Sequence, residues 1–243
     1  MTEEQIEQRI EELVDRIKSK NFEGTDEEIK IQQIMYFDKY VKDNIDYGFE
    51  AVNFQMQHPN EPNPYESAFK REGFFMADEK TQKRLAVCGS ISSIANSVLA
   101  KLGIKCDYVW GHYNIGTEQN PIYLGHRWNV VTLGEKNFML DYTLGMIIHN
   151  IEKDEIYYNA AQQLLGNETK EEYDFLFFDT LPPKATIGGF KKNENGETVD
   201  DMDEQGKLKN TTNNARKVIP NLGSIQQEYI IKCAESITPN KTY

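Results

Sequence analysis

The sequence has little cysteine and no long apolar run. Three cysteines lie far apart in 243 residues, so they do not form the disulfide framework typical of small secreted domains. No apolar stretch approaches the roughly 20 residues that a membrane-spanning helix needs. The N-terminus also lacks the basic and apolar regions of a signal peptide. These absences predict a soluble cytoplasmic protein that does not associate with membranes.

Basic residues are scarce as well. Lys and Arg total 27 against 39 Asp and Glu, which gives a net charge of −12. An acidic surface repels phosphate groups and releases no counterions from them, so we expect no nucleic acid as a partner. Metal-ligand spacings such as CxxC and HxxxH do not occur, and we predict no metal and no cofactor.

Aromatic residues, at 11% of the chain, supply bulky material for a core. We interpret the chain as a single domain with a helical extension over residues 1–32, a core over 33–145 and a C-terminal extension over 146–243. Within the last part, residues 191–215 are acidic and punctuated by Asn and Gly, which predicts a solvated loop.

Three segments have the periodicity of helices. Residues 2–20 and 25–47 each begin with a Thr that is followed three residues later by Gln or Glu, as in a capping box. Apolar residues share one face over 89–102, and Gly103 ends that helix. We expect irregular structure over 49–80. Weaker patterns predict further helices over 156–165 and 224–233.

Three segments alternate as β-strands do: 104–110, 127–132 and 136–142. A loop over 111–125 separates the first two, and Gly134-Glu135 indicates a hairpin between the last two. The predicted fold class is therefore α+β, with a helix packed on an antiparallel sheet.

Cys88 directly precedes the helix over 89–102. A thiol there lies beside unpaired N–H groups and the positive end of the helix dipole, which lower its pKa and favour the thiolate. The same N–H groups can stabilise an oxyanion. Cys106 and Cys233 lie within a predicted strand and a predicted helix, and we expect both to be unreactive.

His126 and Asp141 lie at the outer ends of the predicted hairpin. With the turn at Gly134-Glu135 they fall almost opposite each other, within reach of a hydrogen bond. A thiolate, an imidazole that acts as acid and base, and a carboxylate that orients the imidazole are suited to nucleophilic acyl transfer. We therefore predict Cys88, His126 and Asp141 as catalytic residues. Aromatic residues nearby either fill the core or line a groove for a peptide or a glutamine side chain: Tyr108, Trp110, Tyr113, Tyr123 and Trp128.

These blocks resemble the transglutaminase-like superfamily of papain-like cysteine enzymes over about residues 33–145. The resemblance rests on Cys88 at a helix start, on Gly125-His126-Arg127-Trp128-Asn129 and on Met139-Leu140-Asp141-Tyr142. It implies a papain-like core with a Cys-His-Asp triad. It also makes Gln82 a weak candidate for an oxyanion-hole side chain, since papain-type enzymes keep a Gln six residues before the nucleophile.

The sequence departs from that family at two positions, although neither change removes a catalytic group. Val87 precedes the nucleophile where Gly is common, and Tyr142 follows Asp141 where Pro is common.

The resemblance implies a peptidase or amidase that acts on a peptide or protein substrate through a Cys thioester. A transglutaminase, in which an amine replaces water as the acceptor, stays open as an alternative. A non-catalytic protein-binding module on the same fold is the other alternative, because one fold hosts many functions. An amidase of the peptide N-glycanase kind is disfavoured, because the chain has no zinc-binding cysteine pair. The sequence does not indicate an oligomeric state.

Overall fold

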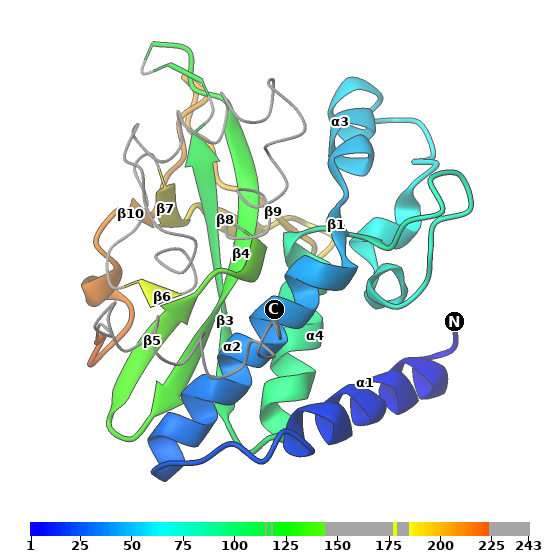
Figure 1. Ribbon diagram of the computed structural model, residues 1–243. Coiled ribbons are helices and arrows are strands. Elements are labelled where there is room, and N and C mark those ends of the chain that lie inside the picture. Colours follow the sequence, from blue (N-terminus) through cyan, green and yellow to red (C-terminus); the bar gives the residue numbers. More distant parts are fainter. Residues whose placement is uncertain (115, 118, 144–176, 179–184, 224–243) are drawn as a thin grey trace, which may run out of the picture.

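The computed structural model describes residues 1–114, 116–117, 119–143, 177–178 and 185–223. The elements in chain order (Figure 1) are α1 (Glu3–Lys18), α2 (Asp26–Asn44), β1 (Asp46–Tyr47), α3 (Phe49–Gln57), the 3-10 helices η1 (Glu66–Phe69) and η2 (Arg71–Phe74), β2 (Leu85–Ala86), α4 (Cys88–Lys101), β3 (Lys105–Asn114), β4 (Tyr123–Leu133), β5 (Lys136–Leu140), β6 (Phe177–Phe178), β7 (Ala185–Gly188), β8 (Phe190–Lys192), β9 (Thr198–Asp200), β10 (Thr211–Thr212) and the 3-10 helix η5 (Ala215–Lys217). The helices expected over 156–165 and 224–233 lie outside the described residues. Within the described part, no helix has both the length and the apolar character to cross a bilayer.

An antiparallel sheet of six strands forms the centre of the fold, in the order β10-β7-β3-β4-β5-β6. β3 and β4 form its longest pairing, from Lys105 opposite Thr132 to Asn114 opposite Tyr123. The tight turn between β4 and β5 contains Gly134 at φ +58°, a conformation that glycine adopts without strain. The predicted α+β class, with an antiparallel sheet and a helix that starts at the cysteine, is confirmed.

The sheet extends beyond the predicted core. β6, β7 and β10 all follow residue 145, yet they belong to the same sheet as β3, β4 and β5. The connection between β3 and β4 is also shorter than the predicted loop over 111–125, because β3 continues to Asn114 and β4 begins at Tyr123.

Both predicted capping boxes are confirmed. The Thr2 hydroxyl accepts a hydrogen bond from the Gln5 N–H at 3.3 Å, and the Gln5 side chain accepts one from the Thr2 N–H at 2.9 Å. Thr25 and Glu28 repeat this exchange at the start of α2. These bonds satisfy N–H groups that a helix start otherwise leaves unpaired.

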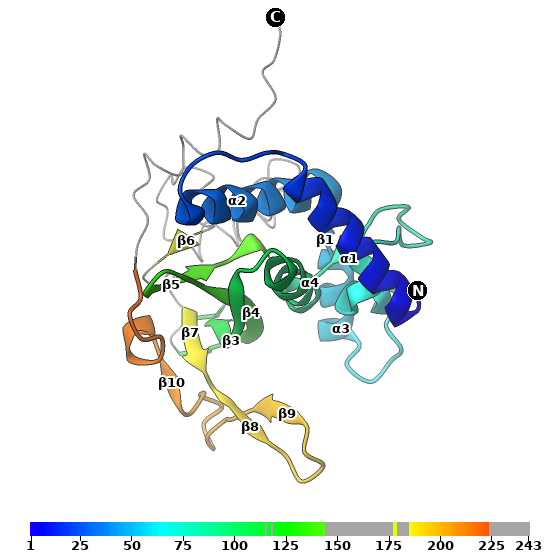
Figure 2. The same cartoon turned by 90° about the horizontal axis from the view of Figure 1, so that it is seen from below.

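The helices cover one face of the sheet. α4 packs on β3 and β4, and α1 packs on α4 from the outer side (Figure 2). The core on this side draws on α1, α2, α4, β4 and β5, as in the contact of Phe37 with Tyr142, whose ring centroids are 5.0 Å apart. The opposite face of the sheet has a smaller core around Trp128, Met139 and Ile187. The sheet is therefore buried on both faces at β4.

Residues 49–57 form α3 instead of the irregular connection expected there. Gly48 gives this helix no side-chain cap, and Ala51 is its one buried residue, so the segment lacks both signals that mark a helix in a sequence. Asn63 from the following loop donates to the carbonyl oxygen of Ala51 at 2.7 Å. A contact of this kind, made after the helix ends, is not visible in local periodicity.

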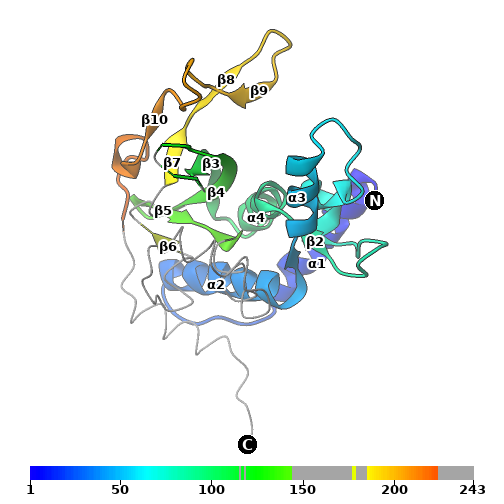
Figure 3. The same cartoon turned by 90° about the horizontal axis from the view of Figure 1, so that it is seen from above.

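Residues 191–215 are largely exposed, as their composition predicts, but they are not a loop throughout because they include short strands. β8 and β9 form a hairpin that projects from the sheet (Figures 2 and 3). The buried imidazole of His112 anchors it, with Nε2 at 2.9 Å from Oδ1 of Asp200 and Nδ1 at 3.0 Å from the carbonyl oxygen of Gly188. The same ring stacks on Phe190 at 4.2 Å between centroids. His112, a buried residue of β3, therefore connects the base of this hairpin to the central sheet.

Candidate active site

Cys88 is the first residue of α4, and hydrogen bonds hold the backbone that leads into it. The preceding residues Leu85–Ala86 pair in parallel with Asp46–Tyr47. Val87 donates its N–H to the hydroxyl of Ser90 at 3.0 Å, and that hydroxyl donates to the carbonyl oxygen of Ala68 at 2.8 Å. The half-buried thiol is thus fixed at the positive end of the helix dipole.

His126 and Asp141 form a buried hydrogen-bonded pair. Nε2 of His126 lies 2.7 Å from Oδ2 of Asp141, and the two side chains are 8% and 1% exposed. Oδ1 of Asp141 accepts the main-chain N–H of Thr143 at 3.0 Å. Together these contacts hold the imidazole in one orientation, with Nδ1 left for another partner.

The register that produces this pair differs from the one expected. β4 and β5 pair Asn129 with Leu140, and continuing that ladder would place residue 143, not Asp141, opposite His126. The two side chains therefore meet as diagonal neighbours across the strands, a separation that His and Asp can bridge. The hydrogen bond between them was predicted correctly, although the alignment of the strands was not.

The thiol of Cys88 hydrogen-bonds with the His126 side chain. Burial raises the pKa of Cys88, but the hydrogen bond and charge of His126, together with the Arg127 main-chain N–H, lower it below its usual value. Burial likewise opposes the charged form of His126, yet the charge and hydrogen bond of Asp141 raise the pKa of His126 to about 10. Both shifts favour a thiolate–imidazolium pair.

Tyr47 is a further residue of this site that the sequence did not single out. Its hydroxyl accepts a hydrogen bond from the main-chain N–H of Cys88 and shares another with the thiol. Burial and the neighbouring Cys88 charge raise the pKa of the Tyr47 phenol well above its usual value. The pairing of Tyr47 with Ala86 places it there, and a two-residue parallel pairing has no local sequence signal.

Gln82 does not lie where an oxyanion-hole side chain would. It occupies an exposed turn at φ +59°, and its side chain donates to the carbonyl oxygen of Glu79 at 2.8 Å. The amide is thus engaged by a contact within the turn. The structure therefore does not support the candidate role of Gln82, and Tyr47 is the side chain found at the Cys88 N–H.

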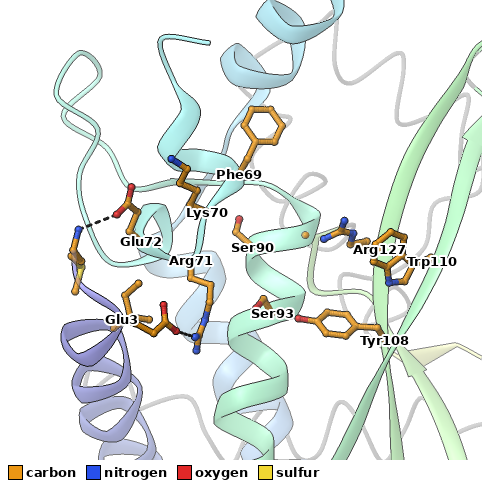
Figure 4. A pocket seen from close by; sticks show the side chains of 13 residues that line it. Glu3, Phe69, Lys70, Arg71, Glu72, Ser90, Ser93, Tyr108, Trp110 and Arg127 are labelled. Atoms are coloured by element: carbon orange, nitrogen blue, oxygen red, sulfur yellow. Dashed lines mark hydrogen bonds and ion pairs between the residues drawn. The ribbon is translucent and has the colours of Figure 1, made fainter. Parts of the chain in front are cut away.

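A cavity of about 500 Å³ opens at the start of α4, where Gly89 and Ser90 form part of its lining and Cys88 itself does not (Figure 4). Tyr108 and Trp110 line it, as the groove hypothesis allowed. Trp128 and Tyr113, by contrast, are 0% and 5% exposed and belong to the interior. The aromatic cluster is therefore divided between the groove and the core.

Cys106 shows no sign of reactivity. Burial, with the charge of Asp107, raises the pKa of Cys106 to about 12, while Cys233 lies outside the described residues. Nor do the described residues contain a group of three or more His, Cys, Asp or Glu side chains that could hold a metal ion.

No protein-family model matches the chain, and no curated protein matches its sequence. Among solved structures, one described as a TGase is similar to it, with a TM-score of 0.42 and 20% sequence identity. The alignment covers 59% of this chain and 33% of that chain, so this chain spans about a third of the solved structure's length. We base the function proposed below on the contacts of Cys88, His126 and Asp141.

Proposed function

We propose that this chain is a cysteine-dependent enzyme of the transglutaminase-like type that breaks amide bonds through a Cys88 thioester. The observation that supports this most is the hydrogen-bonded series from Cys88 through His126 to Asp141, with the pKa of the thiol lowered and that of the imidazole raised. A structural cysteine or histidine needs neither shift.

In the proposed reaction the Cys88 thiolate attacks the carbonyl carbon of the amide. The carbonyl oxygen gains the negative charge. The hydroxyl of Tyr47 turns from the thiol to donate to this oxygen, which also frees the main-chain N–H of Cys88 as a second donor. His126 then gives its proton to the nitrogen as the carbon–nitrogen bond breaks. An amine leaves and a thioester remains.

Resolution of the thioester reverses these roles. His126 removes a proton from water, the resulting hydroxide attacks the thioester carbon, and the carbon–sulfur bond breaks to release an acid and restore the thiol. Asp141 keeps the imidazole oriented and stabilises its charged form throughout. We propose water as the acceptor, and hence a peptidase or amidase acting on a peptide or protein substrate in the cytoplasm.

A single set of assays separates this proposal from its alternatives. Unfolded casein is incubated with the wild type and with Cys88→Ala, and new N-termini, released ammonia and incorporation of a labelled primary amine are measured. New N-termini, or ammonia without amine incorporation, that depend on Cys88 support hydrolysis. Amine incorporation would identify a transglutaminase instead. A thiol that alkylates like an ordinary one, with a pKa of about 8.5, would overturn the catalytic proposal and favour a binding module.

A further inference from the structure

The cavity at the start of α4 has one wall, formed by α1 and η2, that presents no uncompensated charge, because the charged groups there are already paired. The pairs are Glu3 with Arg71, Glu72 with the amino group of Met1 at 2.9 Å, and Lys70 with Glu66 at 2.8 Å. Figure 4 shows the first two of these pairs on the side of the cavity formed by α1 and η2.

Arg127 lies on the opposite wall, next to Trp110 (Figure 4). The guanidinium carbon of Arg127 is 4.0 Å from the centroid of the Trp110 ring, a cation–π contact that restrains the position of the group. Among the described residues, no carboxylate forms an ion pair with it. The cavity therefore contains a positioned cation without an internal anion.

Two contacts place this cation next to the nucleophile. The main-chain N–H of Arg127 bonds to the thiol of Cys88. A Cβ atom on Gly89 would lie 3.0 Å from Nη1 of Arg127, so the absence of a side chain at Gly89 leaves room for the guanidinium. The guanidinium therefore lies against the residue that follows the nucleophile.

We propose that Arg127, held against Trp110, binds a substrate carboxylate close to the amide carbonyl that Cys88 attacks. The inference rests on the proposed function and names its substrate class. A guanidinium can hold a carboxylate by two parallel hydrogen bonds, which gives direction as well as attraction. Tyr108 on the same side and Phe69 on the facing side, 38% and 40% exposed, add apolar surface to the cavity. The ligand is therefore a carboxylate on a peptide, either an acidic side chain or the C-terminal group.

The net charge of −12 makes this cation selective. Most of the surface repels an acidic peptide, so such a substrate gains attraction mainly where Arg127 meets it.

Alkylation of Cys88 tests the proposal without a known substrate. Rates with iodoacetate, a carboxylate, and iodoacetamide, its neutral analogue, are measured by mass spectrometry of the Cys88 peptide in the intact chain. We expect the iodoacetate-to-iodoacetamide rate ratio to fall about tenfold in Arg127→Gln, equivalent to about 1.4 kcal/mol. Arg127→Lys, which keeps the charge but not the paired N–H donors of the guanidinium, should retain part of the preference for iodoacetate. Arg9→Gln, on the exposed face of α1, controls for net charge and should leave the ratio unchanged.

An unchanged ratio in Arg127→Gln overturns the carboxylate site, whereas fast alkylation by iodoacetamide in the same protein still supports the thiolate. Slow, ordinary alkylation by iodoacetamide counts against the proposed function, and the ratio continues to report on Arg127 alone. The two failures are thus distinguishable.

Protection against iodoacetamide identifies the source of the carboxylate. The ligands are N-acetylglutamate amide, with a side-chain carboxylate, N-acetylglutamine, with a terminal one, and the neutral N-acetylglutamine amide. We expect a charged ligand to protect Cys88 better than the neutral one in the wild type and to lose that advantage in Arg127→Gln. The charged ligand that protects Cys88 more strongly identifies the carboxylate as a side-chain or a C-terminal group. Equal protection by all three would contradict the proposal.

Discussion

Nε2 of His126 lies 2.7 Å from Oδ2 of Asp141, in a pair that is almost completely shielded from water. Because that nitrogen is occupied, Nδ1 is the atom left to interact with the thiol of Cys88. The carboxylate is therefore the reason why the imidazole can hold a proton next to a thiolate.

Replacing this carboxylate should disable the site while leaving the fold intact. Asp141→Asn keeps the shape but removes the charge that raises the pKa of His126, so the imidazolium and the thiolate both become less populated. We expect amide cleavage to fall about 10³- to 10⁴-fold. Turnover and thermal unfolding are measured together, and unchanged turnover in a folded variant would remove Asp141 from the mechanism.

The alkylation rate of Cys88 should follow a pH profile displaced to the acid side of an ordinary thiol, because His126 lowers the pKa of the thiol. In His126→Gln that influence is gone, whereas burial and the charge of Asp141, which both raise the pKa, persist. The midpoint should therefore move from below to above about 8.5. The check is the rate of iodoacetamide labelling at Cys88 from pH 4 to pH 11, and coincident profiles would contradict the pairing.

The same pair should stabilise the fold within a defined pH window. His126, raised from 6.5 to about 10, contributes stability that is complete below pH 6.5 and lost as the pH rises through 10. Cys88, lowered from 9.0, contributes stability that is present above pH 9.0 and lost as the pH falls through its lowered pKa.

Below pH 9.0, and above both 6.5 and the lowered pKa of Cys88, these two dependences cancel, since folded and unfolded chains then hold the same number of protons on the pair. We expect the difference in unfolding free energy between the wild type and Cys88→Ser/His126→Gln to be flat in this window and to decline as the pH rises above 9.0. Urea unfolding at a series of pH values measures it, and a difference that changes steadily across the window would contradict the ion pair.

Tyr47→Phe should slow amide cleavage strongly and change the pKa of the Cys88 thiol little. The variant removes the hydroxyl beside the Cys88 N–H, where the oxyanion forms in the proposed reaction, and we expect a loss of about 10²-fold. Tyr113→Phe is the matched control. Its buried hydroxyl has no hydrogen-bond partner among the described residues, and its ring lies 4.9 Å from that of His126. Equal effects of the two variants on turnover would count against an oxyanion role for Tyr47.

Gly111→Ala should distort the strand beside His126. A Cβ at Gly111 would lie 2.1 Å from the main-chain oxygen of Thr186, where β7 packs closely against β3. Main chain cannot yield as a side chain does, so we expect a loss of about 2 kcal/mol in the free energy of unfolding. Gly125→Ala, where a Cβ would meet nothing within 4 Å, should stay within about 0.5 kcal/mol of the wild type. Chemical denaturation compares the two.

The parts of the fold that the sequence could predict are those set by local chemistry. Thr2 and Thr25 begin helices because their hydroxyls accept nearby N–H groups, and Gly134 turns the hairpin that brings His126 to Asp141. Each of these signals acts within a few residues, or across a single turn.

What escaped prediction depends on contacts between distant segments. Tyr47 reaches Cys88 only because β1 pairs with β2, and Arg127 becomes a binding candidate only when Trp110 lies beneath it and Gly89 leaves space. Gln82 illustrates the opposite case, because its spacing from the cysteine fits a family pattern while its amide bonds to Glu79 within an exposed turn.

The place of β3 between β4 and β7 has a consequence for folding. β4 follows β3 after a short connection, so this pairing closes a small loop, whereas Gly111 meets Ile187 only after most of the chain has been made. Loop closure becomes less favourable with length, so the β3–β7 pairing forms late. Until then β3 is an open edge strand, with unpaired backbone groups beside the strand that carries His126. The nascent chain is therefore most prone to aggregate through β3, the strand that pairs with the His126 strand in the complete fold.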